Sequence, residues 1–213
     1  NGVHASETTK TPLDRFDYMS FHAPTCKLVA KSYARLLYND YLADPSHPAF
    51  ADVPSELRDM DYKKSISDKA VEKTFMGLSK KRFQERVQPS IEVPTMCGNM
   101  YCASVYGGIV SLISKVDSSA LQGKRIGIFS YGSGLASSLF SIKIDGSTET
   151  MQKVLAIQER LAARTTVAPA VYDEVRTNLH EAVQKGSIIS SLLMICSAAN
   201  MRFKHRPGSG MTM

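Results

Sequence analysis

Three polar side chains at one joint of the sequence have types that could bind and polarise a ligand. His22 follows an apolar, strand-like run, and Lys27 and Lys31 come on the next helical turns. An imidazole can exchange a proton near neutral pH. Two ammonium groups four residues apart lie on one helix face, where they can bind phosphates as point charges. The pattern predicts a phosphate-bearing ligand that runs past His22. A structural histidine and a solvated lysine face are the alternatives.

Two further polar residues lie in loops that contain glycine. Asn99 follows a glycine and precedes an apolar helix, so its amide could donate to a carbonyl oxygen or simply cap the helix. Ser133 lies between two glycines in SYGSG, a turn whose backbone N–H groups could meet an oxyanion or a carboxylate. A plain hairpin turn is the alternative, because SYGSG is neither a Walker loop nor a nucleophile elbow.

The elements that must position these residues alternate between strand-like and helical patterns. Strands are predicted at residues 16–22, 125–131 and 135–144, with a tight glycine turn between the last two. Helical periodicity predicts five helices. The first opens with Pro24 and runs to Leu42, and the second passes through Val71, Phe75 and Leu78 and ends before Pro89. The others are predicted from Tyr101 to Ile113, at residues 149–163 and at residues 169–184. Residues 44–65 are rich in proline and predict a surface excursion. The order predicts an α/β fold with a buried sheet.

The third helix is the most apolar of these segments. Tyr101, Val105 and Ile109 mark its inward face, and Gly107 and Gly108 would let another backbone approach closely. We therefore expect a buried central helix.

Composition narrows the class of protein. The chain has 213 residues, 43% of them apolar, which is enough for one domain or half of a larger one. No leader and no apolar run of membrane-spanning length is present, so a soluble intracellular protein is expected, with no membrane insertion. Asn1 in place of a methionine indicates a processed or trimmed chain. The net charge of +6 permits an anionic ligand, and without a basic–aromatic motif no nucleic acid is expected.

Four cysteines show no repeated spacing: Cys26, Cys97, Cys102 and Cys196. Reduced thiols are expected in an intracellular protein of this kind. Cys97 and Cys102 have no histidine nearby in the sequence, so no metal site is predicted.

Three long motifs, in this order, closely resemble the C-terminal half of eukaryotic 3-hydroxy-3-methylglutaryl-coenzyme A (CoA) synthases: FHAPTCKLVAKSYARLLYND, GNMYCASVYGGIVSLIS and GKRIGIFSYGSGLASSLFS. VAPAVYDEVRTNLHEAVQKGSI continues the similarity, which covers residues 16 to about 190. The resemblance implies a thiolase-like layered α/β fold, with a buried mixed sheet flanked by helices, and a homodimer for the complete enzyme. It also implies the condensation of acetyl-CoA with acetoacetyl-CoA in the mevalonate pathway, with these thioesters as substrates and no cofactor.

The same resemblance implies a role for each candidate residue. His22 matches the active-site histidine that contacts the acetoacetyl substrate and helps to polarise its carbonyl. Lys27 and Lys31 match lysines that contact CoA, and Lys31 is also near the acyl end. Asn99 matches an asparagine that contacts the acyl portion, and Ser133 a serine that contacts the hydroxymethylglutaryl group.

In that family the nucleophilic cysteine and the general acid/base glutamate belong to the N-terminal half, which has no counterpart among these residues. Cys26 is not expected to be the nucleophile, since it follows His22 in the motif and starts a helix. We therefore expect these 213 residues alone not to catalyse the condensation. A catalytically inactive CoA-binding or scaffold homologue is the alternative.

The predicted organisation has three parts. Residues 1–15 form a flexible N-terminal segment, residues 16–190 the C-terminal hydroxymethylglutaryl-CoA synthase domain, and residues 191–213 a divergent, disorder-prone tail. The tail lacks the aromatic strand with which the family usually closes. A cytoplasmic location is expected, with a mitochondrial one left open.

Overall fold

The computed structural model describes residues 10–166 and 168–184 of the chain. These residues fall into two compact units, the first ending at Ile157 and the second beginning at Gln158. The first unit contains the sheet and all five candidate residues.

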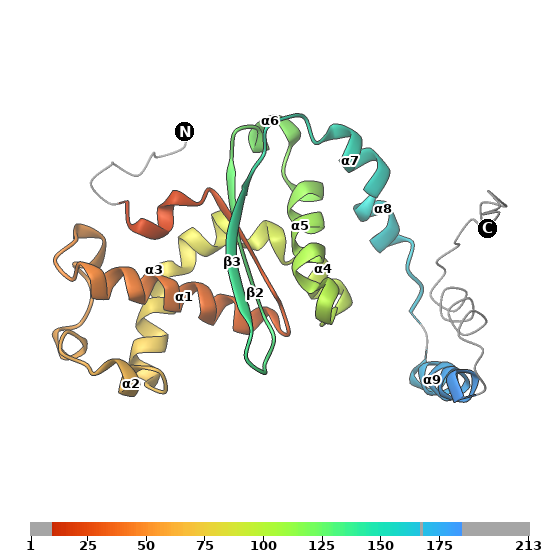
Figure 1. Cartoon of the computed structure of the whole chain (residues 1–213), viewed down its shortest axis with the longest axis horizontal. Helices are drawn as coiled ribbons and strands as arrows, with labels where there is room; N and C mark the ends of the chain where they lie inside the picture. Colours follow the sequence, from red (N-terminus) through yellow and green to blue (C-terminus); the bar gives the residue numbers. More distant parts are fainter. Residues whose placement is uncertain (1–9, 167, 185–213) are drawn as a thin grey trace, which may run out of the picture. The chain divides into compact units, whose positions relative to one another are not determined.

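Three strands of the first unit form a mixed sheet in the order β1–β2–β3 (Figure 1). The strands are β1 (Tyr18–Phe21), β2 (Arg125–Tyr131) and β3 (Ser137–Lys143). β1 and β2 run parallel, whereas β2 and β3 form an antiparallel hairpin. A parallel pair needs a crossover between its strands, and the helices from α1 to α6 supply it. The three strands and the glycine hairpin predicted from the sequence are confirmed.

The helices of this unit are α1 (Cys26–Ala43), α2 (Tyr62–Ser65), α3 (Lys69–Arg86), α4 (Glu92–Cys97), α5 (Ser104–Lys115), α6 (Ser118–Leu121) and α7 (Glu149–Leu155). Short 3-10 turns occur at η2 (Pro12–Arg15), η3 (Pro48–Phe50), η4 (Ser55–Leu57), η5 (Gln88–Ser90) and η6 (Tyr101–Ala103). The predicted surface excursion at 44–65 holds η3, η4 and the one-turn helix α2, and it contributes Phe50, Val53 and Leu57 to the core.

Helices cover both faces of the sheet (Figure 1). On one face, α1 and α3 pack against β1 through a cluster that includes Phe21, Tyr33 and Phe75. On the other face, α5 packs against β2 through a cluster that includes Leu112 and Ile128. Alternate side chains of a strand point to opposite faces of its sheet, so β1 and β2 can contribute side chains to both clusters.

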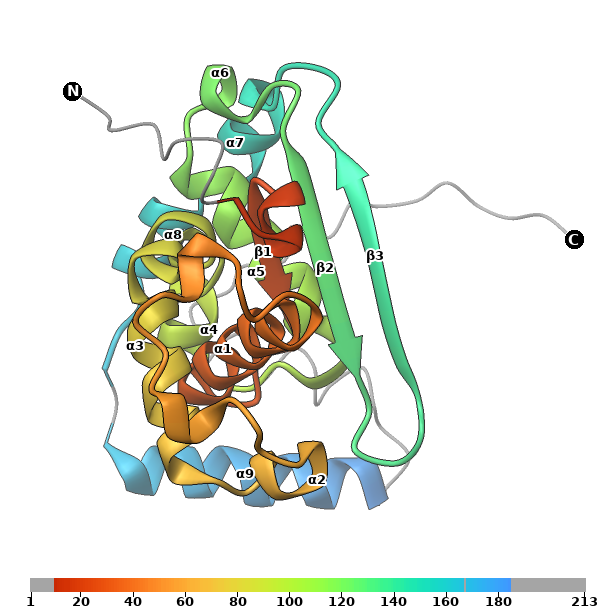
Figure 2. The same cartoon turned by 90° about the vertical axis from the view of Figure 1, so that its left-hand side faces the viewer.

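The burial of the sheet is uneven. β1 and β2 contribute fully buried residues, whereas most of β3 is exposed. The prediction of a buried sheet therefore holds for β1 and β2 but not for β3. β2 lies between the other two strands (Figure 2). Of the two edge strands in the described residues, β1 is packed against α3 and α5, whereas β3 contacts mainly β2.

Three details of the helices differ from the sequence prediction. Pro24 precedes α1 instead of opening it, because Thr25 is the N-cap and its Oγ1 accepts a hydrogen bond from the Leu28 amide. Tyr101 is 75% exposed and has a positive φ of 50° in η6, so it is not part of the inward face of α5. The helix predicted at 149–163 is interrupted at Ala156, whose left-handed backbone ends α7.

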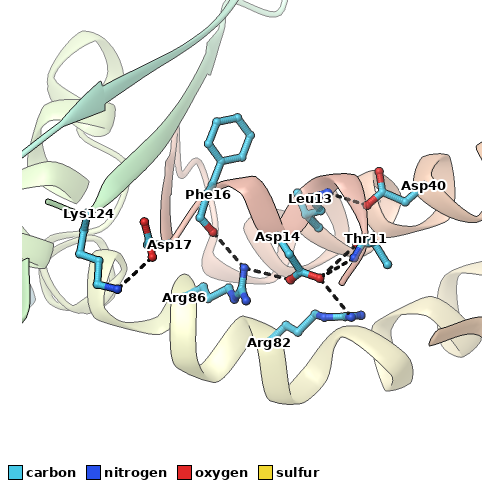
Figure 3. Close-up of polar contacts among 9 residues, drawn as sticks. All are labelled: Thr11, Leu13, Asp14, Phe16, Asp17, Asp40, Arg82, Arg86 and Lys124. Atoms are coloured by element: carbon cyan, nitrogen blue, oxygen red, sulfur yellow. Dashed lines mark hydrogen bonds and ion pairs between the residues drawn. The ribbon is translucent and has the colours of Figure 1, made fainter. Parts of the chain in front are cut away.

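The N-terminal turn η2 is fixed to the body of the first unit by polar contacts (Figure 3). The Asp14 carboxylate pairs with Arg86 at 2.9 Å and with Arg82 at 3.3 Å, both on α3. The Leu13 amide donates to the Asp40 carboxylate of α1 at 2.8 Å, and the Leu13 side chain is buried. The packed fold therefore includes residues that the sequence analysis placed in its N-terminal segment.

The second unit contains α9 (Pro169–Gln184), which confirms the helix predicted at 169–184. It also contains most of α8 (Ile157–Ala162). None of the helices in the described ranges is both long and apolar enough to cross a membrane. Cys196 and the predicted tail at 191–213 lie outside the described residues.

Candidate functional site

His22 lies directly after β1, at the edge of the sheet where the parallel strands β1 and β2 end. Its backbone amide donates to the Phe129 carbonyl of β2 at 2.8 Å, which continues the strand pairing by one step. Its ring meets the ring of Tyr131 edge-on, with 5.2 Å between the centroids. The imidazole is partly exposed, so it combines a fixed backbone with access to a ligand. Carboxyl ends of parallel strands are a common place for ligand sites in α/β folds.

A second contact ties the His22 segment to the start of α5. The amide of Ala23, the next residue, donates to the Ser104 Oγ at 2.9 Å, and both residues are buried. Cys26, in the first turn of α1, lies 3.2 Å from the hydroxyl of Thr95 on α4. The loop that carries Asn99 connects α4 to η6 and α5, so these two contacts hold both of its ends near His22.

Asn99 is exposed, and its side-chain oxygen accepts a hydrogen bond from the Tyr101 amide at 2.9 Å. It therefore supports the turn before η6 and is not the N-cap of α5, whose N-cap is Ala103. The side-chain oxygen of Asn99 is therefore already hydrogen-bonded within the turn. The amide nitrogen, which can only donate, has no hydrogen-bond partner in the described part of the chain.

Ser133 lies in the loop that joins β2 to β3. The loop is closed by a hydrogen bond of 2.8 Å from the Gly132 amide to the Ala136 carbonyl, and Ser133 is exposed. Tyr131, which touches His22, is only two residues earlier. The structure therefore places the Ser133 loop and His22 at the same end of the β1–β2 pair.

The two lysines of α1 differ in their surroundings. Lys27 is exposed in the first turn, where the unpaired amides of a helix N-terminus add to the positive potential. Lys31 is partly buried, and its Nζ pairs with the Glu72 carboxylate of α3 at 2.9 Å. This acidic partner is not among the residues expected from the sequence. Only the packing of α1 on α3 reveals it, because the two residues are far apart in the sequence.

An open pocket of about 430 Å³ begins beside Lys31. The sheet contributes Phe21, Phe129 and Leu139 to its apolar lining, and α1 and α3 contribute further apolar residues such as Leu36 and Phe75. Its polar lining includes Arg35 and Glu72. The Arg35 guanidinium is held by the side chain and carbonyl of Ser65, at 3.0 and 2.7 Å. His22, Asn99 and Ser133 do not line this pocket, so it does not connect them with Lys31.

Three residues near the predicted site were missed by the sequence analysis: Tyr131, Ser104 and Glu72. Tyr131 could have been found, because it ends the strand parallel to the one before His22. Ser104 and Glu72 carry no sequence signal, since each is one of many similar residues on a helix. Cys26, Cys97 and Cys102 form no disulfide. The described residues contain no cluster of three or more His, Cys, Asp or Glu side chains placed to hold a metal ion.

This geometry can support polar chemistry on a carbonyl group. An imidazole fixed at a strand end can polarise a carbonyl oxygen, and an amide and a hydroxyl from adjacent loops can donate to the developing charge. The cationic first turns of α1 can bind phosphate groups.

Comparison with known proteins places these elements in a family. Residues 1–194 match the family described as hydroxymethylglutaryl-coenzyme A synthase C terminal. A hydroxymethylglutaryl-CoA synthase of Zymoseptoria tritici is 71% identical over 181 residues, which cover 85% of this chain and 39% of that protein. The hydroxymethylglutaryl-CoA synthase of Saccharomyces cerevisiae is 52% identical over 171 residues, which cover 79% of this chain and 34% of that protein.

Solved structures agree with the sequence relatives. The enzyme MvaS in complex with 3-hydroxy-3-methylglutaryl coenzyme A superposes with a TM-score of 0.59 and 26% identity, over 81% of this chain and 36% of that one. PksG, a hydroxymethylglutaryl-CoA synthase of Bacillus subtilis, shares the fold with a TM-score of 0.53 at 20% identity, over 77% of this chain and 33% of that one. The chain spans about two fifths of the length of its most similar relatives. It belongs to the hydroxymethylglutaryl-CoA synthase family, has that family's thiolase-like α/β fold, and corresponds to its C-terminal part.

Proposed function

We propose that this chain supplies the C-terminal part of the active site of a hydroxymethylglutaryl-CoA synthase, which condenses acetyl-CoA with acetoacetyl-CoA. The observation that carries the proposal is the position of His22 at the carboxyl ends of β1 and β2, in a chain whose family is established. The bound hydroxymethylglutaryl-CoA of MvaS supports the same ligand class for this chain.

In the proposed reaction His22 polarises the ketone of acetoacetyl-CoA as a carbanion attacks it. Asn99 and Ser133 donate hydrogen bonds to the acyl portion, from loops at the same end of the sheet. A donor held in place before the reaction stabilises developing charge without the cost of reorganisation. Lys27 and Lys31 bind the phosphates of CoA and so orient the acyl group toward His22.

The ion pair of Lys31 gives this binding a built-in competitor. Before a phosphate can use Lys31 in full, it must share the ammonium group with Glu72 or displace it. Such a partly exposed pair contributes about 1 kcal/mol or less. Lys27 can serve as the first contact of the phosphate, because no carboxylate is paired with it in the described residues. A phosphate with more than one negative charge can then outcompete the single carboxylate of Glu72 for Lys31.

The nucleophilic cysteine and the general acid/base glutamate belong, in this proposal, to an N-terminal part of the enzyme. The 213 residues alone are accordingly proposed to bind acetoacetyl-CoA but not to form hydroxymethylglutaryl-CoA. The complete enzyme is proposed to be a cytoplasmic homodimer that uses CoA thioesters as substrates and needs no cofactor.

Calorimetric titration of acetoacetyl-CoA into the chain tests the proposal. The double variant Lys27→Ala/Lys31→Ala should weaken binding about tenfold or more, since it removes two charge contacts to phosphate. Lys80→Ala/Lys81→Ala removes the same charge from an exposed part of α3 and should change the affinity less than about twofold, because screening weakens distant charges. Equal losses in both variants would indicate non-specific attraction and count against the proposed site.

A measurement of turnover distinguishes an active synthase from a catalytically inactive homologue. A full-length product with an N-terminal part should form hydroxymethylglutaryl-CoA, and its His22→Ala variant should lose condensation while still acetylating the nucleophilic cysteine. Binding without turnover in such a full-length product would favour a CoA-binding scaffold instead.

A further inference from the structure

The short helix α2 and the helix α3 that follows it carry a concentration of exposed lysines. Residues 62–81 contain six lysines and two carboxylates, a net charge of +4. The whole chain carries +6, so most of its excess positive charge belongs to this segment. The six lysines are all exposed and form what we call the lysine face: Lys63, Lys64, Lys69, Lys73, Lys80 and Lys81.

Three of these lysines lie on one side of α3. Lys69, Lys73 and Lys80 are separated by four and seven residues, which places them on the same face of the helix over about 16 Å. The other side of α3 contributes Val71 and Phe75 to the core. α2 leads into α3 through residues 66–68, so its two lysines add to the charge at the N-terminal end of α3 (Figure 2).

The carboxylates in and beside this segment are engaged by other groups. Asp61 and Asp68 accept hydrogen bonds from backbone amides in the first turns of α2 and α3. Glu72 pairs with Lys31 of α1. Within residues 10–166 and 168–184, no ammonium group of the lysine face forms an ion pair. The lysine face can therefore attract an external partner of negative charge.

Two large apolar side chains are exposed beside the lysines of α2. Tyr62 is 50% exposed and Ile66 is 64% exposed. They are four residues apart, at the first residue and at the C-cap of α2. Tyrosine is enriched where a bilayer meets water, and lysines around an aromatic and an aliphatic side chain are typical of segments that bind there.

We propose that the lysine face, together with Tyr62 and Ile66, is a peripheral docking surface for membranes that contain anionic lipids. The two apolar side chains enter the headgroup region, and the lysines are held by the negative surface potential of the bilayer. The contact stays at the membrane surface, and no segment crosses the bilayer.

The residue types favour a lipid surface over an acidic protein. Contacts between proteins are enriched in arginine and depleted of lysine, whereas the cations of residues 62–81 are all lysines. Lysine acts as a hydrated point charge and lacks the planar geometry with which arginine holds a fixed carboxylate. Lipid headgroups can move to meet such charges, so they need no fixed geometry on the protein.

The docking surface is independent of the proposed reaction. None of the five candidate residues belongs to it: His22, Lys27, Lys31, Asn99 and Ser133. Failure of acetoacetyl-CoA binding would therefore leave the docking surface unaffected, and failure of membrane binding would leave the proposed CoA contacts unaffected.

Co-sedimentation of the 213-residue chain with lipid vesicles tests the proposal. Phosphatidylcholine vesicles with about 30% phosphatidylserine should bind the chain about tenfold or more tightly than pure phosphatidylcholine vesicles, and this binding should weaken as salt is raised from about 0.05 to 0.3 M. Lys69→Gln/Lys73→Gln should weaken it about tenfold or more. Lys143→Gln/Lys153→Gln removes the same charge from exposed positions of β3 and α7 and should change it less than about twofold.

A tryptophan reporter tests whether α2 itself touches the lipid. The chain contains no tryptophan, so Tyr62→Trp introduces a single one. Its fluorescence should shift to the blue when the anionic vesicles are added, and brominated lipids should quench it. Tyr106→Trp, at a 65% exposed position of α5, should show neither effect.

Four outcomes would overturn the proposal. The first is a chain that binds neither kind of vesicle or binds both equally, and the second is an equal loss of binding in the two double-lysine variants. The third is an unshifted emission of the Tyr62→Trp variant on vesicles that bind the chain. The fourth is binding to a short RNA under conditions where the anionic vesicles are not bound, which would assign the lysine face to nucleic acid.

Discussion

The hydroxyl of Ser104, at the start of α5, accepts a hydrogen bond from the backbone amide of Ala23, 2.9 Å away and 81 positions earlier in the sequence. Ser104 is fully buried. A second contact joins the same two segments, because the Ser20 hydroxyl in β1 donates to the Val105 carbonyl of α5 at 3.3 Å. The chain just after β1, which includes His22, is therefore attached to the element that follows the Asn99 loop.

Ser104→Ala should loosen this attachment. The Ala23 amide would lose its acceptor while remaining buried, and an unsatisfied buried donor costs about 1–3 kcal/mol. Urea unfolding should show a loss of this size, and acetoacetyl-CoA should bind more weakly because His22 and Asn99 are less firmly placed. Ser119→Ala, at an exposed position of α6, should change the stability by less than about 0.5 kcal/mol. If the two variants unfold alike, the hydrogen bond of Ser104 does not stabilise this joint.

Glu72→Gln should increase the affinity for acetoacetyl-CoA. The change removes the carboxylate that lies 2.9 Å from Lys31 and so releases an ammonium group for phosphate. The expected gain is roughly two- to fivefold, the equivalent of a partly exposed ion pair. Calorimetry measures it directly. Glu85→Gln removes the same charge from an exposed position of α3 and should have a smaller effect, so an equal gain in both would mean that only net charge matters.

The strands could be predicted from the sequence because each combines a short apolar run with clear boundaries. The regular core positions of α1 and α3, such as Tyr33 and Phe75, also follow from helical spacing. The exposure of β3 could not be predicted, since its apolar residues look the same whether or not another strand covers them. Tyr101 was assigned to an inward helical face, but the turn closed by Asn99 gives it a positive φ and exposes its side chain.

The candidate site shows the same division. Its histidine and loops could be found because they lie at strand ends and next to glycines, which are visible in the sequence. The partners that fix them could not, because they come from packing between distant segments. Lys31 was recognised as a cation, yet its pairing with Glu72 depends on how α1 lies on α3.

Asp17 should make the stability of the protein depend on acidic pH. Partial burial opposes ionisation of its carboxyl, but the hydrogen bonds from the Arg125 amide and the Lys124 ammonium group, with the nearby positive charges, outweigh it and lower the pKa. Figure 3 shows the contact of Asp17 with Lys124. A lowered folded-state pKa stabilises the protein above the unfolded value of about 3.9, and this stabilisation is lost as the pH falls through the folded value.

Asp17→Asn should therefore lower the free energy of unfolding at pH 7, by roughly 1 kcal/mol or less because the pair is partly exposed. The difference from wild type should shrink below about pH 4. Urea unfolding between pH 2 and pH 7 measures both, with Asp145→Asn as a control at an exposed aspartate. A difference that stays constant over this range would mean that the Asp17 charge contributes nothing to stability.

Two glycines on different helices should respond in opposite ways to alanine. Gly108 of α5 lies so close to β1 that an added methyl group would collide with the Ser20 hydroxyl and lie 3.3 Å from the Ser90 carbonyl. Ser20 is fully buried and bonded to the Val105 carbonyl, so it cannot turn aside without losing that bond. Overpacking of this kind costs about 1–3 kcal/mol of stability, more than the gain of about 1 kcal/mol in helix propensity.

Gly77 is an exposed residue of α3 and has no atom within 4 Å of the added methyl group. Its replacement by alanine should therefore stabilise the protein by most of that ~1 kcal/mol. Thermal unfolding should thus place Gly108→Ala below and Gly77→Ala above the wild type, and equal stabilisation by both would show that α5 does not pack this closely on β1.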